Sequence, residues 1–197
     1  ARPIDLHLKG LEALGATIEI EHGDVLATAK GGLKGGEIYL GGSYGSSVLA
    51  TANVMMAAVL AKGTTYIENA ASEPELVDLA EFLIKMGARI KGHGSHLIEI
   101  QGVKKLHGAR HRIIPDRIEA GTFMVAGMMT KGGDVTVRGC IPDHNHALLD
   151  KLSQAGAHVT KFKNAVRVRR NGALKPIDVT TLPYPGFPTD LQAQIMA

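Results

Sequence analysis

The sequence has 197 residues, 45% hydrophobic and 21% charged, which fits a globular protein of one large or two smaller domains, and no apolar run reaches the ~18–20 residues of a membrane span. Its single cysteine excludes an internal disulfide framework and favours a reducing, cytoplasmic compartment. A net charge of +3 and an aromatic content of 4% give little support to nucleic-acid binding, so we expect neither a nucleic-acid nor a membrane partner.

One sequence motif occurs three times, at residues 11–18, 82–90 and 152–159. In each copy an apolar helical pattern ends at a glycine and an alternating strand pattern follows. The glycines, Gly15, Gly87 and Gly156, lie 72 and 69 residues apart (87 − 15 and 156 − 87). This period exceeds the roughly 20–50 residues of solenoid repeats. It predicts large α/β units that pack around a shared core.

Two segments, residues 51–63 and 121–132, are apolar around the whole helical circumference. A helix without a polar face is normally buried on all sides, so we expect two interior helices here. A strand pattern follows each segment, at residues 64–68 and 134–137. Residues 190–197 resemble the first turns of a third such helix.

Ser72, Pro74 and Glu75 predict a capping box, with Ser72 as the N-cap of an amphipathic helix. The apolar face of this helix follows at helical spacing, as Leu76, Leu79, Ala80, Leu83 and Met86. Two-stranded hairpins are expected around residues 21–24, 92–95 and 163–164.

A stretch without helical pattern, residues 110–115, predicts a domain boundary near residue 114. The chain starts without Met inside a helical pattern and stops within another. We therefore expect it to be part of a longer polypeptide.

Two polar segments open predicted helices in the first half of the chain. Residues 2–7 combine Arg, Asp and His with the exposed N–H groups of a helix start, which suits an anion such as a diphosphate. An Asp favoured by the helix dipole beside two surface cations is the structural alternative. Ser47 and Val48 follow a glycine-rich stretch and suit either a phosphate or a simple N-cap.

Two further polar segments open the later interior helices. Asp116 is expected as an N-cap, with Glu119 three residues on, which is a purely structural duty. Asp190 is either a cap or, if partly desolvated, a general base. Interior helices would begin at Ser47, Arg117 and Asp190, about 70 residues apart. In a repeated architecture these helix starts lie at equivalent edges, some of them facing a shared cleft.

No metal site is predicted. The pairs His93 and His96, and His144 and His146, lack the spacing of zinc ligands. Cys140 has no base beside it in the sequence and is interpreted as an inert small residue.

Taken in order, these segments resemble the UDP-N-acetylglucosamine 1-carboxyvinyltransferases along all 197 residues. The ordered set is specific, although no single motif is decisive. The resemblance rests on residues 2–7, Ser47 and Val48 with Asn53, and residues 63–65, 68–71, 73–75, 115–123 and 187–194. It implies an α/β fold of the inside-out barrel type, built of repeated βαβαββ units with buried helices and outer sheets. Residues 1–114 would be the latter part of the first domain and residues 115–197 the first repeat of the second.

The implied reaction transfers the enolpyruvyl group of phosphoenolpyruvate to the 3-hydroxyl of UDP-N-acetylglucosamine and releases phosphate, without metal or organic cofactor. This is the first committed step of peptidoglycan synthesis, and so bears on cell wall biogenesis, cell shape and division. The implied partners are the two small substrates and the rest of the parent chain. The shikimate-pathway enolpyruvyl transferase and a non-catalytic nucleotide-sugar-binding paralogue are the alternatives.

The resemblance also implies roles for individual residues. Asp190 would be the base that contacts the sugar hydroxyl. The nucleotide sugar would contact Asp190 and Arg2, Pro3, Ile4, Asp5, Leu6, His7, Ser47 and Val48. Four residues match cleft positions with less defined roles: Glu73, Asp116, Arg117 and Glu119.

The chain departs from the family pattern at three positions near Ser47 and Val48. Leu49 and Ala52 replace a Gly and a Glu of many members, and Gly45 stands where some place a phosphate-binding Lys. A leucine side chain crowds the approach of a phosphate to the backbone, which argues against that contact. The family's catalytic-loop proton donor and its phosphoenolpyruvate-binding Lys and Arg lie outside the chain, so we expect no turnover from these residues alone.

Overall fold

The computed structural model describes residues 4–42 and 45–197. The chain divides between Ile113 and Ile114 into two compact units, here called unit 1 and unit 2, and each is described by itself. Residues 102–116, which join them, contain neither helix nor strand. In the described part of the chain, no helix is both long and apolar enough to cross a membrane.

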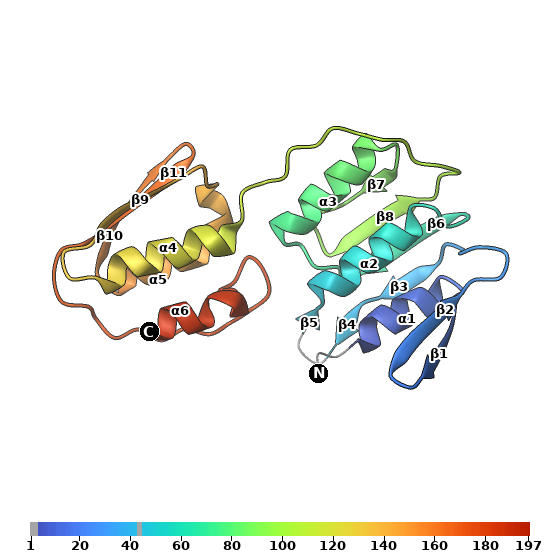
Figure 1. Cartoon of the computed structure of the whole chain (residues 1–197), viewed down its shortest axis with the longest axis horizontal. Coiled ribbons are helices and arrows are strands. Elements are labelled where there is room, and N and C mark those ends of the chain that lie inside the picture. The colour runs from blue at the N-terminus through green and yellow to red at the C-terminus, as the bar shows by residue number, and fades with distance from the viewer. Residues whose placement is uncertain (1–3, 43–44) are drawn as a thin grey trace. The chain divides into compact units, whose positions relative to one another are not determined.

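Unit 1 combines a mixed sheet with helices packed on one of its faces (Figure 1). The helices are α1 (Asp5–Ala13), α2 (Val48–Ala58) and α3 (Pro74–Lys85). The four-stranded sheet has the order β3 (Glu37–Tyr39), β6 (Thr64–Glu68), β8 (Leu97–Gln101) and β7 (Arg89–Lys91). Two hairpins add β1 (Thr17–Glu21) with β2 (Asp24–Thr28), and β4 (Gly41–Gly42) with β5 (Gly45–Ser46).

The sheet of unit 1 has one buried and one exposed face because its side chains alternate. Ile67 and Ile98 are fully buried beneath the helices, whereas Tyr39 and Leu97 are 55% and 52% exposed on the other side. β3 and β6 are connected through α2 and pair in parallel, and the remaining strand pairs of this sheet are antiparallel. The chain order β3-α2-β6-α3-β7-β8 is a βαβαββ unit, as predicted.

Unit 2 repeats most of this pattern. Its sheet is antiparallel throughout, in the order β10 (Ala157–Phe162), β11 (Ala165–Arg170) and β9 (Asp134–Arg138). Its helical segments are α4 (Arg117–Met129), η1 (Pro142–Asn145), α5 (His146–Gln154), η2 (Thr189–Leu191) and α6 (Gln192–Met196). The series α4-β9-α5-β10-β11 matches α2-β6-α3-β7-β8 in unit 1. The alternation of helix and strand agrees with the predicted α/β class, and the predicted repeat is confirmed.

The repeated glycines end their helices as predicted. Gly15, Gly87 and Gly156 have φ values of +89°, +102° and +103°, which only glycine adopts without strain. After α3, the Gly87 N–H donates to the carbonyl of Ile84 at 2.9 Å and the Ala88 N–H donates to that of Leu83 at 2.9 Å, which is the Schellman pattern. Each cap turns the chain into the next strand.

All three predicted hairpins form, at β1–β2, β7–β8 and β10–β11. The first has the two-residue turn His22 and Gly23, with φ values of +52° and +93°. Two successive positive φ angles define a type I′ turn, whose twist matches that of the paired strands.

Helix α3 begins one residue later than predicted, and the prediction of Ser72 as its N-cap is wrong. The N-cap is Glu73, with φ −56° and ψ 144°, and its side chain makes no cap hydrogen bond. Pro74 decides the start, because its fixed φ suits the first helical position and forces the preceding residue into an extended conformation.

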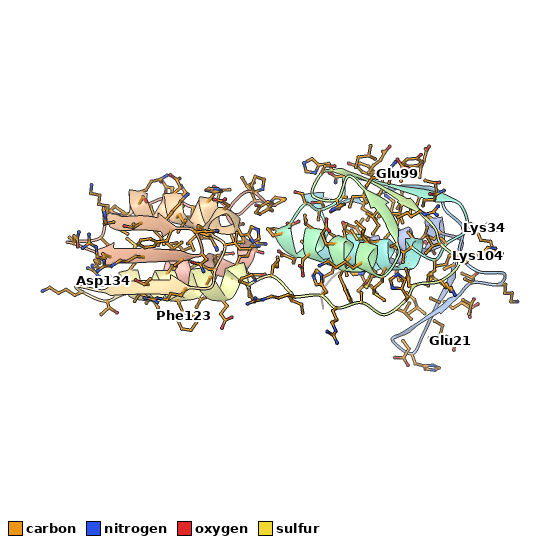
Figure 2. All side chains as sticks on the ribbon, turned by 90° about the horizontal axis from the view of Figure 1, so that it is seen from above. Glu21, Lys34, Glu99, Lys104, Phe123 and Asp134 are labelled. Carbon is orange, nitrogen blue, oxygen red and sulfur yellow. The ribbon has the colours of Figure 1, made fainter. Side chains whose placement is uncertain are left out.

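Within its own unit, each interior helix is buried on one side and exposed on the other. Leu49 and Met56 of α2 are 59% and 44% exposed, and Phe123 and Met129 of α4 are 56% and 47% exposed. Figure 2 shows Phe123 pointing away from its unit. Each sheet covers only one side of its helix, and no other described element of the same unit covers the rest.

Asp134, Arg167 and Cys140, which lie outside the helix starts, have structural roles. Arg167 donates to both carboxylate oxygens of Asp134, through Nε at 2.7 Å and through Nη2. This hydrogen bond lowers the pKa of Asp134 and raises that of Arg167. Burial raises the pKa of the Cys140 thiol, which supports the interpretation of an inert residue.

Helices α1 and α2 touch at a glycine. A Cβ on Gly10 would overlap Val54 Cγ2, and Leu40 Cδ2 would lie 3.5 Å away. Gly10 and Val54 are both buried. The absence of a side chain at Gly10 therefore sets how closely the two helices approach.

We expect Gly10→Ala to destabilise the protein by about 1 kcal/mol. Overpacking costs about 1–3 kcal/mol, and the gain of roughly 1 kcal/mol in helix propensity offsets part of this loss. Urea unfolding would measure the change. Gly108→Ala is the control, because a Cβ there would meet nothing within 4 Å. Equal midpoints for the two variants would contradict the packing argument.

Candidate functional site

The first candidate segment forms the start of α1. Ile4 is the N-cap, and its carbonyl accepts hydrogen bonds from the N–H groups of His7 at 3.0 Å and Leu8 at 3.1 Å. Asp5 lies in the first turn, where the helix dipole favours a negative charge. No side chain caps this helix start. Arg2 and Pro3 lie outside the described residues.

The second segment forms the start of α2. Ser47 is its N-cap, and Ser47 Oγ accepts a hydrogen bond of 3.3 Å from the Ala50 N–H. Val48 is the first helical residue, and Gly45 precedes it in β5 with φ +94°. The predicted capping role of Ser47 is confirmed. Because Ser47 satisfies only one of the four N–H groups that a helix start leaves without an intrahelical partner, an anion could still bind there.

A side-chain hydrogen bond joins α1 to α2. Asn53 Nδ2 lies 2.8 Å from His7 Nδ1. One turn along α1 from His7, Gly10 packs against Val54. The contact therefore holds the start of α1 against the first turns of α2.

A buried hydrogen bond positions the segment that contains Glu73 against α2. The Ala71 N–H donates to Thr51 Oγ1 of α2 at 3.1 Å, and both residues are fully buried. This bond fixes the segment that leads into α3, whose N-cap Glu73 is only 6% exposed. Unit 1 thus gathers residues 4–7, Ser47, Val48 and Glu73 around the beginnings of three helices.

The third segment forms the start of α4 in unit 2. The Asp116 side chain accepts hydrogen bonds from the N–H groups of Ile118 at 2.7 Å and Glu119 at 3.1 Å. The predicted N-cap is confirmed, with Glu119 at the third helical position. The Arg117 guanidinium stacks over the ring of Tyr184, 5.6 Å from its centre. This contact draws residues near Tyr184 to the start of α4.

The fourth segment lies in η2, which packs against α4. Leu191 is fully buried, and a Cβ on Gly121 would lie 2.8 Å from its Cδ1. Gln194 Nε2 donates to Thr122 Oγ1 at 3.0 Å. These contacts hold Asp190 beside the first turns of α4.

Asp190 itself is exposed in unit 2. Within the unit, Leu191 and not Asp190 faces the core. Asp190 also caps no helix with its side chain, since Pro188 is the N-cap of η2.

The structure thus places the candidate residues in two groups, one in each unit. Asn53 and Tyr184 contact candidate residues but were given no role from the sequence. Asn53 lies within a quoted motif, whereas no sequence pattern marked Tyr184. Among the described residues, no three His, Cys, Asp or Glu side chains gather as metal ligands.

A family model described as EPSP synthase (3-phosphoshikimate 1-carboxyvinyltransferase) matches residues 1–197. The chain belongs to this family. Within the EPSP synthase family, it is similar to curated proteins named UDP-N-acetylglucosamine 1-carboxyvinyltransferase. The relative from Carboxydothermus hydrogenoformans is 61% identical, that from Finegoldia magna 57% and that from Staphylococcus aureus strain N315 54%. Each match covers 100% of this chain and 46% of the relative, so the chain spans about half the relatives' length. The resemblance inferred from the sequence is confirmed.

Solved structures agree on the fold. The enolpyruvyl transferase NikO from Streptomyces tendae matches with a TM-score of 0.86 at 22% identity, over 98% of this chain and 48% of that one. An EPSP synthase from Acinetobacter baumannii matches with a TM-score of 0.64 at 25% identity, over 92% of this chain and 42% of that one. The predicted fold class is confirmed.

We expect Asp116→Ala to destabilise unit 2 by about 1 kcal/mol, because it removes an N-cap that accepts two hydrogen bonds. Asp116→Asn retains a capping oxygen and should unfold within a few tenths of a kcal/mol of the wild type. Thermal unfolding followed by circular dichroism compares the two. A loss of stability as large in Asp116→Asn as in Asp116→Ala would show that the charge, and not the cap, matters.

Proposed function

We propose that this chain supplies part of the active site of an enzyme that transfers the enolpyruvyl group of phosphoenolpyruvate to the 3-hydroxyl of UDP-N-acetylglucosamine. The observation that carries the proposal is the identity of 54–61%, over the whole chain, to relatives that bear this enzyme's name. The activity belongs to a protein of the relatives' length, of which this chain covers 46%. The process it would serve is peptidoglycan synthesis in the cytoplasm, and through it cell shape and division.

Unit 1 would bind the nucleotide sugar. A diphosphate carries charge that helix N-termini stabilise through their N–H groups and dipoles. The starts of α1 and α2 lie together, joined by the bond between His7 and Asn53, and the first turn of α2 contains no acidic residue. Residues 2–7 with Ser47 and Val48 are the proposed contacts. The exposed Leu49 would limit how closely a phosphate approaches the backbone of α2.

Unit 2 would supply the base. Asp190 would take the proton of the sugar 3-hydroxyl as that oxygen bonds to carbon 2 of phosphoenolpyruvate, while a proton is added to carbon 3. Loss of phosphate from carbon 2 and of a proton from carbon 3 then restores the double bond. The group that protonates carbon 3 is not assigned to this chain. Asp116, Arg117 and Glu119 are proposed as further cleft residues of unit 2, and Glu73 as one of unit 1.

Each unit contributes proposed site residues of its own. Units 1 and 2 are proposed as the latter part of one domain and the first repeat of the next, with the boundary expected near residue 114. Substrate binding would then depend on residues 2–7, Ser47 and Val48 of unit 1, and catalysis on Asp190 of unit 2.

We expect the protein to bind UDP-N-acetylglucosamine and not shikimate 3-phosphate. The family model is named for the shikimate-pathway enzyme, but the relatives of 54–61% identity bear the name UDP-N-acetylglucosamine 1-carboxyvinyltransferase. Isothermal titration calorimetry with the two ligands separates these functions. Binding of shikimate 3-phosphate alone would contradict the proposal and favour the shikimate-pathway enzyme.

In a protein of the relatives' length, we expect Asp190→Asn to lower kcat by about 10²–10⁴-fold, the usual contribution of a general base. A phosphate-release assay with both substrates measures the rate. Asp178→Asn, at another exposed carboxylate of unit 2, is the control and should leave kcat unchanged. If the wild type binds the nucleotide sugar but releases no phosphate, the protein is a non-catalytic paralogue.

A further inference from the structure

Asn53 holds an unusual place on α2. It is exposed, as are Leu49 four residues before it and Met56 three residues after it. Residues at these spacings share one side of a helix, so Asn53 is a polar residue within an otherwise apolar stripe. The hydrogen bond that it makes is to His7, 46 residues away in the sequence.

Buried packing between α1 and α2 holds the contact between Asn53 and His7 in place. Asn53 is followed by the fully buried Val54, which packs against Gly10 of α1. His7 lies three residues before Gly10 and therefore one turn away on the same side of α1. The packing of the helices sets the distance at which Asn53 Nδ2 and His7 Nδ1 meet, 2.8 Å.

The bond selects one form of the imidazole. An amide nitrogen only donates hydrogen bonds, so His7 Nδ1 must accept with its lone pair. A neutral imidazole that accepts at Nδ1 carries its proton at Nε2. His7 therefore presents an N–H donor, and not an acceptor, from the ring nitrogen that Asn53 leaves open.

Helix α1 also packs against β1 and β3, whose charged residues Glu19, Glu21 and Glu37 are all exposed. Helix α2 and strands β4 and β5 contain no charged residue among those described. On α1, Asp5 and Lys9 lie two residues before and after His7, a spacing that does not face it. Lys9 instead extends over the ring of Tyr39, 5.3 Å from its centre.

We propose that Asn53 is a positioning residue that holds His7 as its Nε2–H tautomer, so that Nε2–H donates to a phosphate oxygen of the nucleotide sugar. This inference rests on the proposed function, because the acceptor is the diphosphate bound at the starts of α1 and α2. The tautomer itself follows from the contact between Asn53 and His7 and does not depend on any ligand.

The deciding variant is Asn53→Asp. A carboxylate only accepts hydrogen bonds, so at about pH 8.5, where an ordinary histidine is neutral, His7 should move its proton to Nδ1 and leave a lone pair on Nε2. Asn53→Leu removes the partner altogether. Ala52→Glu is the control, because it adds the same charge to the neighbouring position of α2, about 100° around the helix.

The first measurement is the ring ¹⁵N spectrum of His7 in the ligand-free protein. Wild type and Ala52→Glu should give the Nε2–H pattern, and Asn53→Asp the Nδ1–H pattern. His111 is an internal reference, because Asp78 at 2.9 Å from Nε2 and Lys85 at 3.0 Å from Nδ1 fix its tautomer independently. An unchanged His7 spectrum in Asn53→Asp would overturn the inference.

The second measurement is the Kd of UDP-N-acetylglucosamine, whose diphosphate ester does not titrate in this range. At pH 8.5, Asn53→Asp should bind about tenfold more weakly or worse, since a hydrogen bond to a charged group is lost. The deficit should shrink at any lower pH at which the ring ¹⁵N spectrum shows His7 protonated, because a protonated imidazole again carries an N–H at Nε2. A merely structural effect of the substitution would not depend on pH in this way.

The outcomes separate the two proposals. If the wild type does not bind UDP-N-acetylglucosamine, the proposed function fails, and the binding role of Asn53 with it. If the wild type binds while Asn53→Asp keeps the same affinity at pH 8.5, only the role of Asn53 fails. A tautomer change with a pH-dependent loss of affinity supports both.

Discussion

Two glycines without side chains control how the polar groups are placed. At Gly10, the missing Cβ lets α1 and α2 touch, and one turn away His7 meets Asn53. At Gly121, the missing Cβ lets Leu191 lie against α4, and Asp190 directly precedes Leu191 in the chain. In each unit the buried contact is apolar, while the proposed chemistry lies at its solvent-facing end. Close packing is therefore what gives flexible polar side chains defined positions.

Most candidate residues also have a structural role. For this reason, the spacing of residues in the sequence did not distinguish binding or catalytic residues from residues that stabilise the fold. Ser47 and Asp116 cap α2 and α4 through side-chain hydrogen bonds, and any residue with a suitable oxygen would do the same. Helix starts are the places where an apolar helix must expose polar backbone, so caps and anion sites coincide there. Asp190 differs, because it is exposed and its side chain caps no helix.

Local features were predictable because they depend on few neighbouring residues. The glycine caps, the hairpins and the N-cap Asp116 all follow from backbone angles and short-range hydrogen bonds. The start of α3 was misjudged because the preference of Pro74 for the first turn outweighed the capping tendency of Ser72. What covers the exposed sides of α2 and α4 does not follow from the residues of these helices, because burial depends on the neighbouring elements. The bond between His7 and Asn53 joins residues 46 positions apart, and no local rule predicts it.

The environment of Cys140 has a practical consequence. It is the only cysteine of the sequence, it is 3% exposed, and its Sγ–H points to the Val137 carbonyl at 3.5 Å. Because the thiolate is the reactive form and burial disfavours it, electrophiles should modify this sulfur only when unit 2 opens. The chain thus contains a built-in reporter of local opening in unit 2, one that requires no engineered label.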